Sequence, residues 1–165
     1  MVIAQPYIKH TGECNSPVNF LGGKEMQKVT THATITSFIN QENEKAVLMS
    51  VMVFINNLPI VNTKKDDIKM VLSEAIRNVI MYAYPSKQGN ISIYISVLDN
   101  KILKIQVKDW GCGIKDVNTA TMPSFENDGN HLGMGFLFMN AFCDELTVNS
   151  ILGKGTTVIT KFKIL

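Results

Sequence analysis

One short stretch of the chain combines a carboxylate with two closely spaced glycines. Asp109, Gly111 and Gly113 form the pattern Asp-x-Gly-x-Gly directly after residues 101–107, which alternate as in a strand. A carboxylate at a strand end can accept a hydrogen bond from an amino group, and the glycines let the backbone pass close to a flat ring. The exocyclic amine of adenine is such a group. When the pattern stands alone, a plain glycine turn is the commoner explanation.

A second candidate pair lies on a predicted helix. Glu74 and Asn78 are four residues apart, so their side chains project from the same helix face about one turn apart. The amide oxygen of Asn78 can ligate a hard cation such as Mg²⁺. The carboxylate of Glu74 can accept a proton from a hydroxyl or water that attacks a phosphoryl group. Taken alone, such a pair is more often the solvated polar face of an amphipathic helix.

Two further glycine motifs occur later in the chain. The stretch HLGMGF places Gly133 and Gly135 at the start of a predicted helix, where unpaired backbone N–H groups favour phosphate oxygens. Thr156 follows the two glycines of the stretch GKGTT at the start of a predicted strand. Its hydroxyl could join Asp109 around a base. Each glycine motif by itself also suits an ordinary turn or helix cap.

Apolar spacing predicts the elements that must position these residues. Thr63 and Asp66 resemble a capping box at the start of the helix that carries Glu74 and Asn78. The side chains of Asp99 and Asn100 suit a tight hairpin turn. The predicted helices are 44–58, ended by Pro59, a second from Thr63 to about Ala83, and 134–142. The predicted strands are 31–39, 91–98, 101–107, 145–151 and 156–163. This order indicates an α+β fold, a two-layer α/β sandwich, rather than a doubly wound parallel sheet.

The composition suits one globular domain with its own core. The chain has 165 residues, 45% of them hydrophobic, and a formal net charge of +2. No apolar run approaches the roughly 20 residues of a membrane-spanning helix, and the N-terminus lacks the order of a secretion signal. Three widely spaced cysteines argue against a disulfide framework and a zinc site. We therefore predict a cytoplasmic protein that does not bind a membrane. Because no basic stripe with interleaved aromatics occurs, we also predict no direct binding of nucleic acid.

Residues 1–28 differ from the rest of the chain. Prolines and glycines interrupt them without a clear period, which predicts an irregular arm outside the domain of residues 29–165. Residues 22–25, Gly-Gly-Lys-Glu, are what the purine-rich codons of a ribosome-binding site would give if translated, so Met26 is one candidate for the natural start. An ordinary N-terminal arm is equally well supported. Peptides from residues 1–25 in mass spectra of the native protein would exclude the first interpretation.

The four motifs together are more specific than any one of them. In the order Glu-x-x-x-Asn, Asp-x-Gly-x-Gly, Gly-x-Gly and Gly-x-Gly-Thr, they resemble the ATP-binding boxes of the superfamily of gyrase, heat-shock chaperone ATPases, histidine kinases and mismatch-repair ATPases. Within it, residues 31–165 resemble the anti-sigma factor serine kinases, in particular the sporulation anti-sigma F factors. This resemblance is carried by VLSEAIRNVI, VKDWGCGIKD, GMGFLFMNAFCDEL and GKGTTV.

The resemblance implies a Bergerat-type ATP-binding fold, in which helices cover one face of a mixed, largely antiparallel sheet. ATP and Mg²⁺ would lie between the layers under a lid. His131 stands close to the place where the family has an arginine before Gly-x-Gly. The other implied roles are Asn78 for Mg²⁺, Glu74 as general base, Asp109 for the adenine amine, Gly111 and Gly113 in the base pocket, Gly133 and Gly135 at the phosphates, and Thr156 near the adenine.

The resemblance also implies two linked activities. Members of this family sequester a sigma factor and phosphorylate a serine of an anti-anti-sigma protein, and relatives pair as homodimers through the first strand and first helix. A nucleotide-gated module that sequesters a partner without phosphoryl transfer is the alternative. A sensor kinase is disfavoured because no histidine lies on a long helix before the ATP boxes. A dinucleotide-binding dehydrogenase is disfavoured because no Gly-x-Gly-x-x-Gly joins a strand to a helix.

Two departures from the family pattern concern single residues. Arg77, inside the Glu-x-x-x-Asn helix, is the only arginine of the chain. Leu48 stands where the sporulation relatives use a basic residue to grip the sigma factor. Met49 and Met52 on the same helix suit either the core or an adaptable protein-binding surface.

Overall fold

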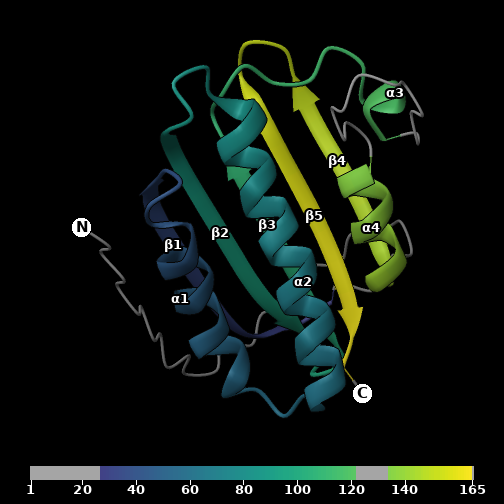
Figure 1. Ribbon diagram of the computed structural model, residues 1–165. Helices are drawn as coiled ribbons and strands as arrows, with labels where there is room; N and C mark the ends of the chain where they lie inside the picture. The colour runs from purple at the N-terminus through teal and green to yellow at the C-terminus, as the bar shows by residue number, and fades with distance from the viewer. Residues whose placement is uncertain (1–26, 122–133, 165) are drawn as a thin grey trace, which may run out of the picture.

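The computed structural model of the protein describes residues 27–121 and 134–164. Within these residues one sheet is covered on one face by helices α1, α2 and α4 (Figure 1). The strands are β1 (Val29–Ile39), β2 (Gly89–Leu98), β3 (Ile102–Asp109), β4 (Glu145–Ile151) and β5 (Gly155–Lys163). The helices are α1 (Glu44–Asn56), α2 (Asn62–Asn78), α3 (Val117–Thr121) and α4 (Met134–Phe142), with a π-helical turn η1 (Val79–Ala83) directly after α2. The predicted α+β two-layer sandwich is confirmed.

The sheet has the strand order β1-β2-β3-β5-β4, and all four pairings in it are antiparallel. The expected mixed sheet is therefore fully antiparallel in the described part of the chain. After the hairpin with β4, β5 lies beside β3 and runs opposite to it, so no parallel pair is formed. Both predicted hairpins are present, and Asp99 and Asn100 have the positive φ values, 49° and 55°, that suit the tight turn.

Alternation along β3 places one polar residue at the edge of the core. Leu103, Ile105, Val107 and Asp109 follow one another at a spacing of two, and all four are buried. The first three pack among the side chains that the helices bury against the sheet, which include Ile68, Leu72 and Ile76 of α2. Asp109 continues the same face at the last position of the strand, so its carboxylate is directed toward the helix layer.

The two longer helices differ in detail from the sequence predictions. On α1, Leu48 and Met52 are buried in the core, whereas Met49 is 52% exposed. The capping box predicted at Thr63 is wrong, because α2 begins one residue earlier at Asn62. Its N-cap is Val61, which has no side-chain cap; the backbone N–H of Lys65 donates to the carbonyl of Val61 instead.

The end of α2 departs from α-helical geometry. The helix was predicted to run to about Ala83, but after Asn78 the chain forms the wider π-helical turn η1. Turns of this kind insert an extra residue and occur frequently at functional sites. Here the turn directs the carbonyl of Ala83 toward the loop after β3, where it accepts the backbone N–H of Cys112 at 2.7 Å.

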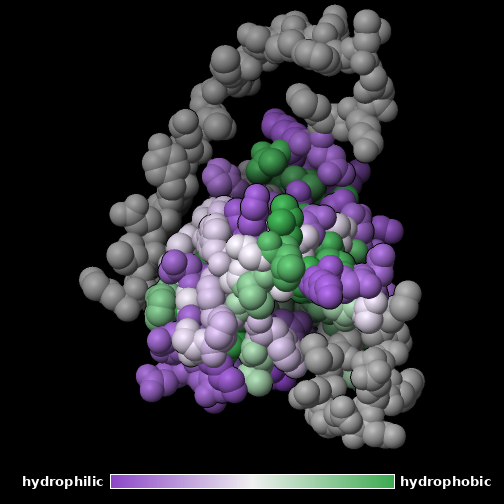
Figure 2. All heavy atoms as spheres, turned by 90° about the horizontal axis from the view of Figure 1, so that it is seen from above, coloured by the Kyte–Doolittle hydropathy of each residue, from purple (hydrophilic) through white to green (hydrophobic). Residues whose placement is uncertain are grey.

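The end of the molecule that holds this loop also carries exposed apolar residues. The view from above shows green, apolar atoms within a largely polar surface (Figure 2). Ile151 and Leu152, at the turn between β4 and β5, are 60% and 64% exposed. In residues 27–121 and 134–164, no helix is both long and apolar enough to cross a membrane.

Candidate functional site

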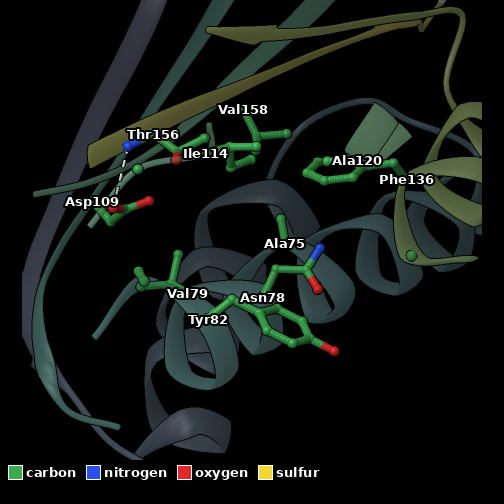
Figure 3. Close-up of a pocket in the computed structure, with 13 residues that line it drawn as sticks. Ala75, Asn78, Val79, Tyr82, Asp109, Ile114, Ala120, Phe136, Thr156 and Val158 are labelled. Carbon is green, nitrogen blue, oxygen red and sulfur yellow. Dashed lines mark hydrogen bonds between the residues drawn. The ribbon is translucent and has the colours of Figure 1, made fainter. Parts of the chain in front are cut away.

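Asp109 is fixed by hydrogen bonds from two separate parts of the chain. Its Oδ1 accepts the backbone N–H of Gly111 at 2.9 Å and that of Thr156 at 3.2 Å. Within the described residues Oδ2 has no protein partner, and in Figure 3 the free carboxylate oxygen is directed into a ring of lining residues. One oxygen therefore holds the carboxylate in place, and the other remains available to a ligand.

Burial makes this carboxylate harder to ionise. The side chain is only 4% exposed. Loss of solvation raises the pKa of Asp109 above its usual value, and the hydrogen bonds from Gly111 and Thr156 partly oppose this shift. An ionised Asp109 is therefore costly for the folded protein unless a hydrogen-bond donor approaches Oδ2.

Glycines make the close approaches around Asp109 possible. A Cβ atom on Gly111 would overlap the carbonyl of Ala83, and one on Gly155 would overlap the carbonyl of Asp109. Gly113 has φ +70°, and a Cβ there would meet the carbonyl of Ile151. Side chains at these positions would thus push the loop away from η1 and from the turn between β4 and β5.

Hydrogen bonds hold the loop after β3 on several sides. Besides the bond to Ala83, the carbonyl of Cys112 accepts the N–H of Gly153 at 2.7 Å. Tyr84 fixes the start of the loop, because its hydroxyl accepts the N–H of Trp110 at 3.0 Å and donates to the carbonyl of Asn90 at 2.6 Å. These hydrogen bonds preorganise the loop between η1 and the sheet.

Glu74 and Asn78 meet the first turn of α4 across the helix layer. A Cβ on Gly135 would lie 2.5 Å from Oε1 of Glu74 and 3.3 Å from Nδ2 of Asn78. A side chain at position 135 would make the carboxylate of Glu74 shift, so the glycine leaves these two side chains in place against α4. The other carboxylate oxygen of Glu74, Oε2, lies 3.5 Å from Nη1 of Arg77, whose side chain is largely exposed.

A cavity of about 240 Å³ opens between the helix layer and the sheet, next to these residues (Figure 3). Its polar groups come from opposite sides: Asn78 belongs to α2, while Asp109 and Thr156 belong to the sheet. The rest of the wall is mostly apolar. The lining residues are Ala75, Asn78, Val79, Tyr82, Ala83, Asp109, Gly113, Ile114, Ala120, Gly135, Phe136, Thr156 and Val158. An apolar slot with a few convergent polar groups is typical of a small-molecule site.

Most of the predicted site residues converge on this cavity. Asn78, Asp109, Gly113, Gly135 and Thr156 line it. Gly111 packs beside it against η1, and Glu74 lies next to Asn78 without belonging to the lining. The predicted residues His131 and Gly133 lie outside the described residues.

The sequence interpretation missed the apolar walls of the cavity. Ile114 and Phe136 each directly follow a predicted glycine, and Val158 lies two positions after Thr156 on the same face of β5. These spacings could have identified the three residues as part of the site from the sequence. Tyr82 and Ala83 were not accessible in this way, because the π-helical turn that directs them has no recognised sequence pattern.

The polar groups of the site suit a nucleotide better than a bare metal ion. In the part of the chain that the structure describes, no three His, Cys, Asp or Glu side chains group to hold a metal. Mg²⁺ commonly takes one or two protein oxygens and completes its shell with waters and substrate phosphates. The single amide of Asn78 fits that mode only together with a phosphate-bearing ligand.

Comparison with known protein families agrees with this geometry. The family model described as the histidine kinase-like ATPase domain matches residues 40–162. The chain belongs to this family. The matched segment contains α2, β3 and α4, and all of β5 except its last residue.

Curated relatives of this histidine kinase-like ATPase domain include several anti-sigma F factors. That of Clostridium acetobutylicum is 37% identical over 124 residues, which cover 74% of this chain and 86% of the relative. That of Caldanaerobacter subterraneus subsp. tengcongensis is 48% identical over 99 residues, covering 58% and 68%. That of Geobacillus stearothermophilus is 34% identical over 122 residues, covering 73% and 84%. The resemblance inferred from the motifs is confirmed.

Solved structures share the fold at low sequence identity. The crystal structure of the RsbU and RsbW domains of a Mycobacterium tuberculosis protein has a TM-score of 0.58 at 16% identity and covers 82% of this chain and 32% of that one. The histidine kinase domain of a blue-light activated kinase from Erythrobacter litoralis has a TM-score of 0.51 at 20% identity, with 73% and 61% covered. Both solved chains extend well beyond the matched part. The predicted Bergerat-type fold is confirmed.

The raised pKa of Asp109 predicts a stability that depends on pH. A folded-state pKa above the unfolded one means that the folded protein binds the proton more tightly. The resulting stabilisation is present below about pH 4 and is lost as the pH rises through the folded pKa. Asp109→Asn stays neutral, so its free energy of unfolding should rise relative to wild type over this interval and then level off.

Urea denaturation at a series of pH values measures this difference. Asn57→Ser serves as the control, because Asn57 is exposed just beyond α1 and neither side chain titrates. The control should show no rise with pH. A constant difference between Asp109→Asn and wild type across the interval would contradict a raised pKa for Asp109.

Proposed function

We propose that the protein is an ATP-dependent protein serine kinase and anti-sigma factor, which sequesters a sigma factor and phosphorylates a serine of an anti-anti-sigma protein. One observation carries the proposal: Asp109, Thr156, Asn78 and Gly135 come from four separate elements and line a single cavity. The anti-sigma F factor relatives support a sigma factor as one partner, because their names describe action on a sigma factor.

The cavity supports ATP as the ligand. The free Oδ2 of Asp109 suits the exocyclic amine of adenine, and the apolar walls formed by Ala75, Val79 and Val158 suit the faces of a flat base. Asn78 and Gly135 lie at the α4 end of the same cavity, where phosphates would be held. Bound there, Mg²⁺ would neutralise charge on the phosphates, and the amide oxygen of Asn78 would be its protein ligand.

Glu74 is the proposed general base. It lies one helical turn before Asn78 and against the first turn of α4, so its carboxylate is next to the proposed phosphate end. From there it would take the proton of the attacking serine hydroxyl. Phosphoryl transfer asks the protein mainly for positioning and charge neutralisation, which fits the small number of polar groups present. Arg77, the only arginine of the chain, lies beside this carboxylate.

A homodimer formed through β1 and α1 is part of the proposal. β1 stands at one end of the strand order. Apolar side chains are exposed on both elements: Phe38 of β1 by 53%, and Met49 and Val53 of α1 by 52% and 62%. An edge strand beside exposed apolar residues is typical of an interaction surface.

Leu48, where sporulation relatives have a basic residue, is buried in α1 and cannot contact a sigma factor. The partners proposed here act in the cytoplasm, which is the proposed location.

The dimer predicts a solution mass twice that of one chain. Light scattering at micromolar concentration should report it for the wild type, and Val53→Asp should give the mass of a single chain because it introduces a charge into the proposed interface. Asn57→Asp, just beyond the end of α1, is the control and should remain dimeric. A monomeric wild type would contradict this part of the proposal.

ATP binding depends on Asp109 if its Oδ2 receives the adenine amine. Asp109→Asn turns an amide N–H₂ toward the base, so two donors would face each other. Calorimetry with ATP and Mg²⁺ should show a loss of affinity of at least about tenfold, the scale of one hydrogen bond to a charged group. Equal ATP affinity in the variant and wild type would remove the adenine pocket from the proposal.

Phosphoryl transfer depends on Glu74 if it is the general base. Glu74→Gln should lower transfer to an anti-anti-sigma protein of the same organism by about 10²-fold or more, because a positioned base contributes on that scale. ATP affinity should stay unchanged, since Glu74 does not line the cavity. Glu44→Gln, in the first turn of α1, is the control and should leave both quantities unchanged.

The same experiment separates the kinase from the alternative. A nucleotide-gated module that sequesters its partner without transferring phosphate would bind ATP but label no acceptor, even in the wild type. Full transfer by Glu74→Gln would show that another group accepts the proton.

A further inference from the structure

Ser150 of β4 has three hydrogen-bonding neighbours behind the cavity. Its Oγ lies 2.8 Å from the backbone N of Ile114, 3.1 Å from the carbonyl oxygen of Gly155 and 2.9 Å from Oγ1 of Thr156. Ser150 and Thr156 are opposite each other in the pairing of β4 with β5. Ser150 does not line the cavity, but Thr156 and Ile114 do.

The number of hydrogens that each group carries determines which group is the donor in each of the three hydrogen bonds of Ser150. A serine hydroxyl has one hydrogen to donate and two lone pairs that accept. The N–H of Ile114 can only donate, and the carbonyl of Gly155 can only accept, so Ser150 gives its hydrogen to Gly155. The remaining contact is satisfied only if Thr156 donates its hydroxyl hydrogen to Ser150. This is the one assignment in which all three contacts carry a hydrogen.

The hydrogen of Thr156 therefore points away from the cavity. Its oxygen keeps two lone pairs and faces the cavity as an acceptor. The other polar atom at this end, Oδ2 of the ionised Asp109 carboxylate, is also an acceptor, and it stays free for a ligand because both backbone donors are bound to Oδ1. The base end of the cavity thus offers acceptors from two side chains.

We infer that Ser150 is a positioning residue that selects the base: by taking the hydroxyl hydrogen of Thr156, it makes the pocket accept 6-aminopurine nucleotides and reject 6-oxopurine nucleotides. An exocyclic amine, or a water beside it, can donate to both acceptors. A 6-oxopurine carries an N1–H donor beside its 6-oxo group, but at the 6-position itself its carbonyl oxygen would face two acceptors with no hydrogen between them, which is costly in a buried site. This inference rests on the proposed nucleotide function, since it concerns the base of the ligand.

ATP and ITP test the inference, because ITP carries a carbonyl in place of the 6-amine of ATP. The wild type should prefer ATP. In Ser150→Ala the hydroxyl of Thr156 becomes free to turn and donate to a 6-oxo group, so the ratio of ITP to ATP dissociation constants should fall by about tenfold, the scale of one hydrogen bond. Calorimetry with Mg²⁺ gives both constants. Ser150→Thr keeps the hydroxyl and should restore the wild-type ratio.

A matched control exists on the other side of the sheet. Ser92 of β2 shares a hydroxyl hydrogen bond of 2.8 Å with Thr36 of β1, a cross-strand pair like that of Ser150 and Thr156 but remote from the cavity. Ser92→Ala should destabilise the fold without changing the ratio. A general loss of packing would affect ATP and ITP alike, so the ratio distinguishes base selection from a purely structural role.

The outcomes separate this inference from the proposed function. If the wild type binds ATP and prefers it, but Ser150→Ala keeps the ratio, the role of Ser150 is overturned and the proposed function stands. A wild type that binds ATP and ITP equally would also overturn the role of Ser150 alone. If the wild type binds neither nucleotide, the proposed function fails and the inference fails with it.

Discussion

The buried carboxylate of Asp109 is the constraint on which the site depends. Its Oδ1 joins the loop after β3 to the start of β5, and the loop in turn is bound to η1 and to the turn between β4 and β5. Burial makes an ionised carboxylate unfavourable. The protein keeps it at the edge of the core, where Leu103, Ile105 and Val107 show that an apolar residue would fit the alternation. A carboxylate at this position therefore costs the fold stability, which is common at functional sites.

Much of the fold could be predicted from residue spacing because the apolar periods are regular. The alternation of β3 predicted both the strand and the placement of Asp109 at its end. Asp99 and Asn100 predicted the turn between β2 and β3, since few residues other than glycine accept positive φ. The antiparallel arrangement of every strand pair was less accessible, because the place of β5 beside β3 is set by contacts between residues far apart in sequence.

In the candidate site too, some residues could be predicted from the sequence and others could not. Asn78, Asp109 and Thr156 were predicted from residue type and glycine spacing, which report chemistry directly. The start of α2 was mispredicted at Thr63, since the backbone carbonyl of Val61, and not a capping side chain, accepts the N–H of Lys65 in the first turn. The role of Ser150 was invisible, because a serine in an alternating strand has no distinguishing pattern. Only its three hydrogen-bonding neighbours in the fold assign the direction of its hydrogen bonds.

The π-helical turn η1 changes the direction in which side chains and carbonyls point between the core-packed part of α2 and the loop after β3. Up to Asn78, α2 follows the ordinary helical period, which keeps Ile68, Leu72 and Ile76 against the sheet. The extra residue in η1 shifts the angular position of everything that follows, so that Ala83 and Tyr84 reach Cys112 and Trp110. Core packing and loop anchoring can thus each keep their own best orientation. The length of this segment, and not only its composition, is therefore constrained by the contacts at both of its ends.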